Sequence, residues 1–95
     1  RLSDPQWTKL ALEASNRALE LNPHLAAAHA TSGFAMVNLS SDRAPEGMRR
    51  LERAIELDPR SALAHCYLGQ AFEKTKQPGR AEESFRKAAS LEPDN

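Results

Sequence analysis

The sequence has only one cysteine, few aromatic residues, no surplus of charge and no long apolar run. A single cysteine, Cys66, cannot form an internal disulfide, so the fold cannot rely on oxidation, and we expect a reducing, cytoplasmic location. Aromatic residues are only 5% of the 95 residues. The apolar content therefore rests on alanine and leucine, which favours closely packed helices over a β-sheet.

The charge balance excludes one large class of partner. Thirteen lysine and arginine residues match thirteen aspartate and glutamate residues, so the formal net charge is zero. Because no basic surplus exists to neutralise a phosphate backbone, we expect no nucleic-acid partner. No apolar run approaches the length of about 18 residues that predicts a membrane span. The chain begins with neither a methionine nor a secretory signal, and we expect it to be a piece of a longer protein or a processed product.

The sequence does contain an internal repeat. Residues 16–33 (NRALELNPHLAAAHATSG) and residues 52–69 (ERAIELDPRSALAHCYLG) are identical at nine of eighteen positions. A third copy begins at residue 87, where KAASLEP follows the pattern of RAIELDP at residues 53–59. Three prolines end the three copies, and they are Pro23, Pro59 and Pro93.

The repeat predicts an all-α fold. Each proline disfavours helical geometry in the residue before it and therefore ends a helix. Further breaks fall at residues 40–42 and 77–79, where serine, proline and glycine gather. Ser61 is expected to cap the helix that follows it. The connections are short, so neighbouring helices must be antiparallel. The predicted helices are 5–21, 26–39, 45–57, 61–75 and 78–91.

The pattern of small residues, aromatics and prolines resembles the tetratricopeptide repeat. The last unit offers His65, Leu68, Gly69 and Phe72 on its first helix, and Ala81, Phe85, Ala88 and Pro93 on its second. The middle unit offers His29, Ser32, Gly33 and Met36, then Gly47, Leu51, Ala54 and Pro59. The first unit offers a second helix only, with Ala11, Ser15, Ala18 and Pro23.

The resemblance implies a stack of antiparallel helix pairs, an α-solenoid fragment that winds as a right-handed superhelix. It divides the single domain into a partial unit at residues 1–25, a unit at 26–61 with a turn two residues longer, and a regular unit at 62–95. It also implies a protein-protein interaction module that holds another protein or a peptide.

Several small residues should let helix backbones approach closely. Gly33 and Gly69 have no side chain, and Leu51 and Phe85 are expected to fill the adjacent space. Gly47 stands where the repeat has alanine, and we expect it to weaken its helix by about 1 kcal/mol. Serines replace larger apolar residues at positions 15 and 32, which predicts looser packing in the middle of the stack.

In a repeat solenoid the first helix of each unit lines the inner face. Two alternatives exist for the apolar stripe on the helix 26–39: neighbours bury it, or it forms a shallow groove centred on Phe34 that takes a helix or an extended peptide. The equivalent stripe in the last unit is more polar. The candidate partner-binding residues are Ala27, Ala30, Thr31, Phe34, Val37, Asn38, Leu63, Cys66, Tyr67, Gln70, Glu73 and Lys74.

Chemical activity is not predicted. Some tetratricopeptide domains grip a terminal carboxylate with basic residues, but the matching positions, which include Ala27 and Leu63, carry no basic side chain. His29 and His65 occupy equivalent repeat positions, where an imidazole is expected to pack rather than to bind metal. Cys66 follows His65 directly, so the two side chains point about 100° apart and cannot form a dyad. We expect no catalytic residue, metal or cofactor.

A structural role is the alternative to an interaction module. The chain could be a spacer or self-association segment of a larger, multidomain protein, with a homodimer formed through uncapped terminal helices. On the last helix, Phe85 and Leu91 are the apolar residues expected to make that contact. Trp7 is expected to pack against a helix that precedes the first one.

Overall fold

The segments between the prolines fold as helices in the computed structural model, which describes residues 4–92. Predicted and observed helices differ by no more than one residue at either end. Pro93, which ends the third copy of the repeat, lies outside the described residues. The elements are α1 (Asp4–Leu21), α2 (Ala26–Leu39), the short 3₁₀ helix η1 (Ser41–Arg43), α3 (Ala44–Leu57), α4 (Ala62–Lys74) and α5 (Pro78–Ser90).

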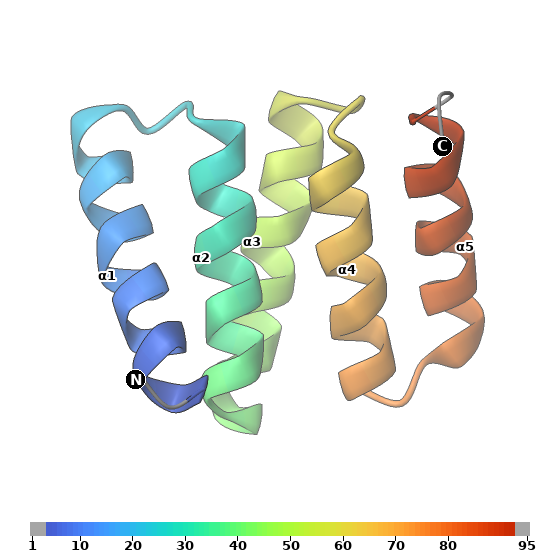
Figure 1. Cartoon of the computed structure of the whole chain (residues 1–95), viewed down its shortest axis with the longest axis horizontal. Coiled ribbons are helices and arrows are strands. Elements are labelled where there is room, and N and C mark those ends of the chain that lie inside the picture. Colours follow the sequence, from blue (N-terminus) through green and yellow to red (C-terminus); the bar gives the residue numbers. More distant parts are fainter. Residues whose placement is uncertain (1–3, 93–95) are drawn as a thin grey trace.

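The helices stand side by side and alternate in direction (Figure 1). Helix α2 is central and contacts α1, α3 and α4, while α5 packs on α4 alone among the helices of residues 4–92. The main core lies between α2, α3 and α4, and it contains Ala30, Val37, Leu51 and Ala64. The all-α, solenoid-like prediction is thereby confirmed. No helix in this described part combines the length and apolar character of a membrane span.

The turns at Pro23 and Pro59 are each tied to the next helix by a histidine. The Nε2 atom of His29 lies 2.8 Å from the carbonyl oxygen of Pro23, and the same atom of His65 lies 3.2 Å from the oxygen of Pro59. A carbonyl oxygen only accepts, so Nε2 carries the hydrogen in both rings. The predicted packing role of these imidazoles is therefore a hydrogen bond that repeats from one unit to the next.

The longer turn between α2 and α3 forms the helix η1. The hydroxyl oxygen of Ser40 accepts a hydrogen bond of 3.3 Å from the backbone N–H of Arg43. Ala44, directly after η1, is buried. The two extra residues are thus taken up in ordered structure. At the next turn, Ser61 caps α4 as expected, since its hydroxyl accepts from the N–H of Ala64.

Helices α2 and α3 touch through two glycines. A Cβ atom on Gly47 would lie 2.5 Å from the carbonyl oxygen of Gly33, and a Cβ atom on Gly33 would lie 2.5 Å from the oxygen of Gly47. No real Cβ makes such a contact, so neither position accepts alanine without a backbone shift. The expected weakening of the helix at Gly47 stays a prediction, and its missing side chain is also what lets the two helices meet.

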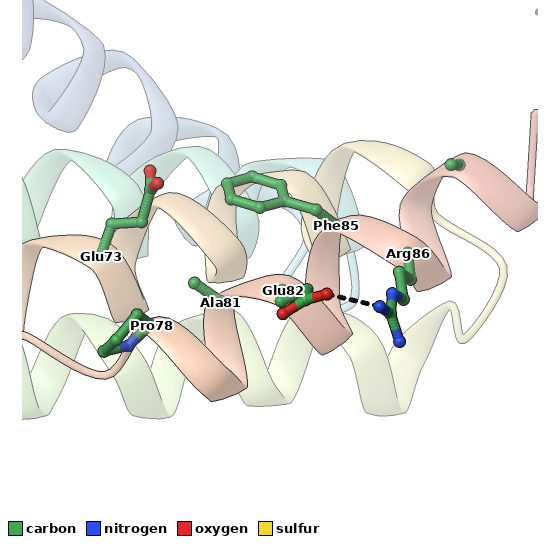
Figure 2. Close-up of a pocket in the computed structure, with 7 residues that line it drawn as sticks. Glu73, Pro78, Ala81, Glu82, Phe85 and Arg86 are labelled. Carbon is green, nitrogen blue, oxygen red and sulfur yellow. Dashed lines mark hydrogen bonds and ion pairs between the residues drawn. The ribbon is translucent and has the colours of Figure 1, made fainter.

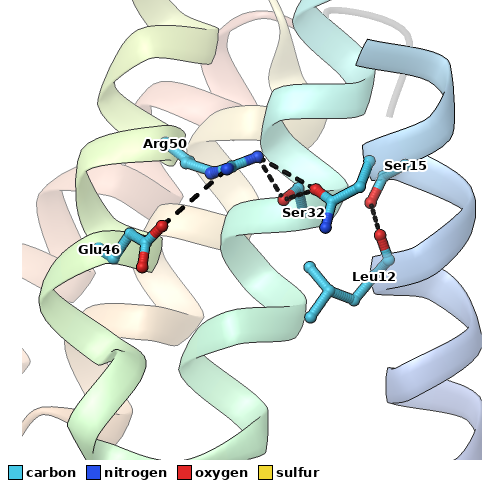
Figure 3. A network of polar contacts seen from close by, with 6 residues as sticks. Leu12, Ser15, Ser32, Glu46 and Arg50 are labelled. Carbon is cyan, nitrogen blue, oxygen red and sulfur yellow. Dashed lines mark hydrogen bonds and ion pairs between the residues drawn. The ribbon is translucent and has the colours of Figure 1, made fainter. Parts of the chain in front are cut away.

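A polar network joins α1, α2 and α3 (Figure 3). The hydroxyl of Ser32, which has no exposed surface, donates to Oδ1 of Asn16 at 3.1 Å. Nη1 of Arg50 donates to that hydroxyl at 3.0 Å and to the same Oδ1 at 3.2 Å. Ser15 is also buried, and its hydroxyl donates to the backbone oxygen of Ala11. Both serines are therefore buried with hydrogen-bond partners, and the looser packing expected at these positions stays a prediction.

Candidate functional site

A groove runs between α1, α2 and α4. It consists of two hollows of about 220 and 500 Å³ that share four lining residues and are therefore continuous. The shared residues are Trp7, Thr8, Phe34 and Asn38. We call this surface the aromatic groove.

Aromatic rings dominate the groove. Phe34 of α2 and Tyr67 of α4 are stacked, with ring centroids 4.3 Å apart and ring planes inclined by 2°. Both rings are half-buried, so one side of the stack faces the groove. Trp7 of α1 lines the same groove, and 61% of its surface is exposed. Three helices thus each bring one aromatic side chain to a single surface.

The rest of the lining mixes polar residues with the apolar Pro5, Ala11, Ala35 and Leu39, and it is almost uncharged. Thr31 and Asn38 from α2 and Gln70 and Lys74 from α4 surround the aromatic rings. Lys74 is the one charged residue that lines either hollow within residues 4–92. The groove can therefore hold an apolar side chain at its centre and hydrogen-bond polar groups around it.

Half of the predicted binding residues meet in this groove. They are Thr31, Phe34, Asn38, Tyr67, Gln70 and Lys74. Ala30 and Val37 do not, because both are buried in the core. Val37 faces α3 instead: its Cγ2 would lie 2.8 Å from a Cβ atom on Gly47. Ala30 and Val37 therefore lie outside the aromatic groove.

The remaining four predicted residues are scattered. Ala27 and Leu63 are exposed but lie outside both hollows. Cys66 is half-buried, and its Sγ accepts from Nε2 of Gln70 at 3.7 Å. Glu73 lines a different hollow, of about 380 Å³, between α4 and α5 (Figure 2). That hollow has apolar walls from Pro78, Ala81, Phe85 and Ala89, and an ion pair between Glu82 and Arg86 at its edge.

Trp7, Thr8 and Ala11 were missed as groove residues. The repeat register makes α1 the second helix of its unit, and second helices are expected on the outer face. The available signal in the sequence was the spacing of Trp7 and Ala11, since a small residue four positions on leaves space beside the ring on the same helix face. Packing against a preceding helix, as expected for Trp7, is a separate prediction that stays open.

Among the residues that the structure describes, the histidine, cysteine and acidic side chains do not assemble into a metal centre. Within residues 4–92, no three side chains of histidine, cysteine, aspartate or glutamate gather in an arrangement that could hold a metal ion. His65 and Cys66 have separate partners, the carbonyl of Pro59 and the amide of Gln70.

Comparison with known proteins gives one family match. No curated protein matches the chain. The model of the tetratricopeptide repeat matches residues 62–95, which include α4 and α5. Within this segment Gly69 lies against Phe85, and Ala81 is buried, as the resemblance implied. Residues 62–95 are therefore a tetratricopeptide repeat, a unit that generally mediates protein-protein interaction.

Proposed function

We propose that the aromatic groove binds a segment of a partner protein, as an extended peptide or as one face of a helix, and that the chain is a non-catalytic interaction module. The exposure of Trp7 beside the stacked rings of Phe34 and Tyr67 carries this proposal. Aromatic side chains dominate binding energy at many protein interfaces, because they bury a large area at little cost in side-chain entropy. A partner that covers Trp7 would remove the largest exposed aromatic surface of the described chain from water.

The polar rim supports a peptide ligand. Asn38 and Gln70 each have an amide that both donates and accepts, which matches the N–H and C=O groups of an extended backbone. Lys74 adds one positive charge at the edge and could pair with a single carboxylate. A ligand with one apolar side chain between free backbone groups fits this lining best.

The test uses Trp7, the only tryptophan in the chain, as the reporter. A random peptide library is selected on the whole chain, and binding of the selected peptides is followed by tryptophan fluorescence and by calorimetry. Trp7→Ala should weaken the best peptides at least about tenfold, as loss of an aromatic hot spot does. Leu21→Ala is the matched control, since Leu21 is 90% exposed but lies outside the groove. Equal affinities for the two variants would refute the groove as the binding site.

A second pair of variants tests the groove floor. Phe34→Ala and Tyr67→Ala each remove one ring of the stack, and each should weaken peptide binding while the helical circular dichroism spectrum is kept. Thermal melting of each variant separates loss of binding from loss of folding. Peptides that bind both variants as they bind the parent chain would show that the stack is core and not contact surface.

Self-association is the second candidate. Helix α1 exposes Leu10 and Leu21 on the side away from α2, and α5 carries the apolar hollow beside Phe85. We propose that a second copy of the chain covers one of these end faces. Light scattering over a range of concentrations tests this, with Ala89→Lys as the variant at the hollow and Leu21→Lys as the variant on α1. A monomer at every concentration contradicts this candidate and leaves the groove proposal intact.

A further inference from the structure

A second concave surface lies on the other side of α2 from the aromatic groove. It is a cleft of about 370 Å³ between α1, α2 and α3, and α3 stands behind α2 in Figure 1. His29 lines the cleft and Asn38 lines the groove; nine residues separate them, which is about two and a half helical turns, so they point to opposite sides of α2. We call this surface the arginine cleft. Its lining residues are Leu19, Pro23, His29, Glu46, Arg49, Arg50 and Arg53.

Positive charge is concentrated in the arginine cleft. Three arginines face one glutamate there, although the whole chain has a net charge of zero. Arg49 makes no hydrogen bond or ion pair within residues 4–92, and its side chain is exposed. Arg53 reaches Glu56 only at 3.9 Å, and Arg50 reaches Glu46 only at 4.0 Å. Such long, solvent-exposed pairs neutralise little charge, so the cleft keeps an attraction for anions.

One arginine is already held in place. The polar network fixes Arg50 through Ser32 and Asn16 (Figure 3). Because its side chain is ordered before any ligand arrives, Arg50 would lose little conformational freedom on binding. The wall beside it is apolar, from Leu19 and Pro23. The Nε2 atom of His29 is occupied by the carbonyl of Pro23, so the imidazole acts as part of this wall.

The repeat fold does not require these arginines. An offset of 34 residues places Glu83, Ser84 and Lys87 of α5 at the positions of Arg49, Arg50 and Arg53. Helix α5 nevertheless forms and packs on α4, with Ser84 buried. Helix packing therefore does not explain Arg49 and Arg53, whereas Arg50 also holds the network with Ser32 and Asn16.

We propose that the arginine cleft binds an acidic peptide segment in which carboxylates flank one apolar side chain. Guanidinium groups match carboxylates with two parallel hydrogen bonds, and Leu19 and Pro23 offer a surface for the apolar side chain. The cleft holds a ligand of side-chain size, and the chain has no net positive charge to attract a phosphate backbone. This site is independent of the aromatic groove, and both surfaces can be occupied together.

Calorimetry on the whole chain tests the proposal with a synthetic peptide that has a central leucine flanked by two glutamates on each side. The matched peptide has glutamines in place of the glutamates. The glutamate peptide should bind and the glutamine peptide should not, and raising the salt from about 20 to about 200 mM should weaken binding about tenfold, because ions screen exposed charges. Equal binding of the two peptides overturns the proposal. Binding of inorganic phosphate in preference to the glutamate peptide overturns the assignment to a peptide.

Variants locate the binding. Arg49→Glu installs the residue that α5 has at the same repeat position, so the fold should be kept while affinity falls about tenfold or more. Arg53→Lys keeps the charge but loses the planar fork, and affinity should fall several-fold. Arg60→Glu is the matched control, because it changes the charge equally at an exposed turn outside the cleft. Equal losses for Arg49→Glu and Arg60→Glu would mean attraction by net charge alone and would overturn the site. Phe34→Ala, in the aromatic groove, should leave this binding unchanged.

Discussion

The helix pairs α2–α3 and α4–α5 occupy the same positions in the repeat but touch through different atoms. In α2–α3, Gly33 and Gly47 bring backbone against backbone, and each blocks a Cβ on the other at 2.5 Å. In α4–α5, a Cβ on Gly69 would meet the ring of Phe85 at 2.7 Å. A carbonyl oxygen within a helix cannot rotate away, whereas a half-buried ring can turn. The first pair is therefore fixed in its spacing, and the second can adjust.

The two pairs also differ in what fills the space beside the glycine. Ser32 is buried in α2–α3 and is hydrogen-bonded to Asn16 and Arg50. The equivalent residue in α4–α5 is Leu68, which is buried among apolar side chains. The same helix-pair geometry thus tolerates a polar or an apolar filling, provided that buried polar atoms have partners. Both differences make α2–α3 the pair in which substitutions should cost more.

The largest effect is expected from Gly47→Ala. The new Cβ would collide with the carbonyl oxygen of Gly33, and only a shift of one helix backbone relieves that contact. Overpacking should outweigh the gain in helix propensity and lower the stability by about 2 kcal/mol, or roughly 10 °C in the thermal midpoint. Circular dichroism melting measures it.

Gly79→Ala is the matched control for this prediction. It makes the same exchange in α5 at a position where a Cβ would meet nothing within 4 Å. Its midpoint should stay the same or rise slightly, because alanine is the better helix former. If Gly47→Ala melts at the temperature of the parent chain, the two backbones do not cross as closely as described.

An intermediate effect is expected from Arg50→Ala. The substitution removes the donor that reaches both Ser32 and Asn16, and the hydroxyl of Ser32 stays buried with fewer partners. Loss of these charge-assisted bonds should cost about 1–2 kcal/mol, measured by urea denaturation. Arg49→Ala, one residue away and exposed, should change stability by less than about 0.5 kcal/mol. Equal midpoints for the two variants would mean that the network contributes nothing to the first pair.

The helices were predictable because the residues close to each helix end determine where it ends. Prolines, the Ser61 cap and short polar turns act within a few residues. Such signals recur in successive units of the repeat. The contact between Gly33 and Gly47 was not predictable from propensity, which describes an isolated helix and so counts a glycine as a defect. The hydrogen bond from Arg50 to Asn16 spans 34 residues and joins helices that are not consecutive, so no local pattern reports it.

Part of the aromatic groove was predictable from the spacing of residues along single helices. Phe34, Tyr67, Gln70 and Lys74 follow from helical spacing on two first helices, and they do lie together. Which residues of a nearly all-apolar helix are buried depends on its neighbours, and α2 has neighbours on three sides. Trp7 reaches the groove because of how α1 crosses α2, which the spacing along either helix does not specify.

The smallest effect is expected from Gly69→Ala, which makes in the second pair the exchange that should be costly in the first. The Cβ would lie 2.7 Å from Cε1 of Phe85, but the ring borders the open hollow and can shift toward it. Relief of that contact should nearly offset the gain in helix propensity, so the net change should be within about 0.5 kcal/mol.

A double-mutant cycle with Phe85→Leu isolates the ring, since the first pair has Leu51 at this position. With the ring removed, Gly69→Ala should become stabilising by up to about 1 kcal/mol, because only the propensity gain remains. Thermal melting of the four proteins gives the coupling free energy between the two sites. A loss at Gly69→Ala as large as that at Gly47→Ala would show that α4–α5 is held as rigidly as α2–α3. In that case the ring of Phe85 would not be free to move, and the adjustable character of the second pair would be wrong.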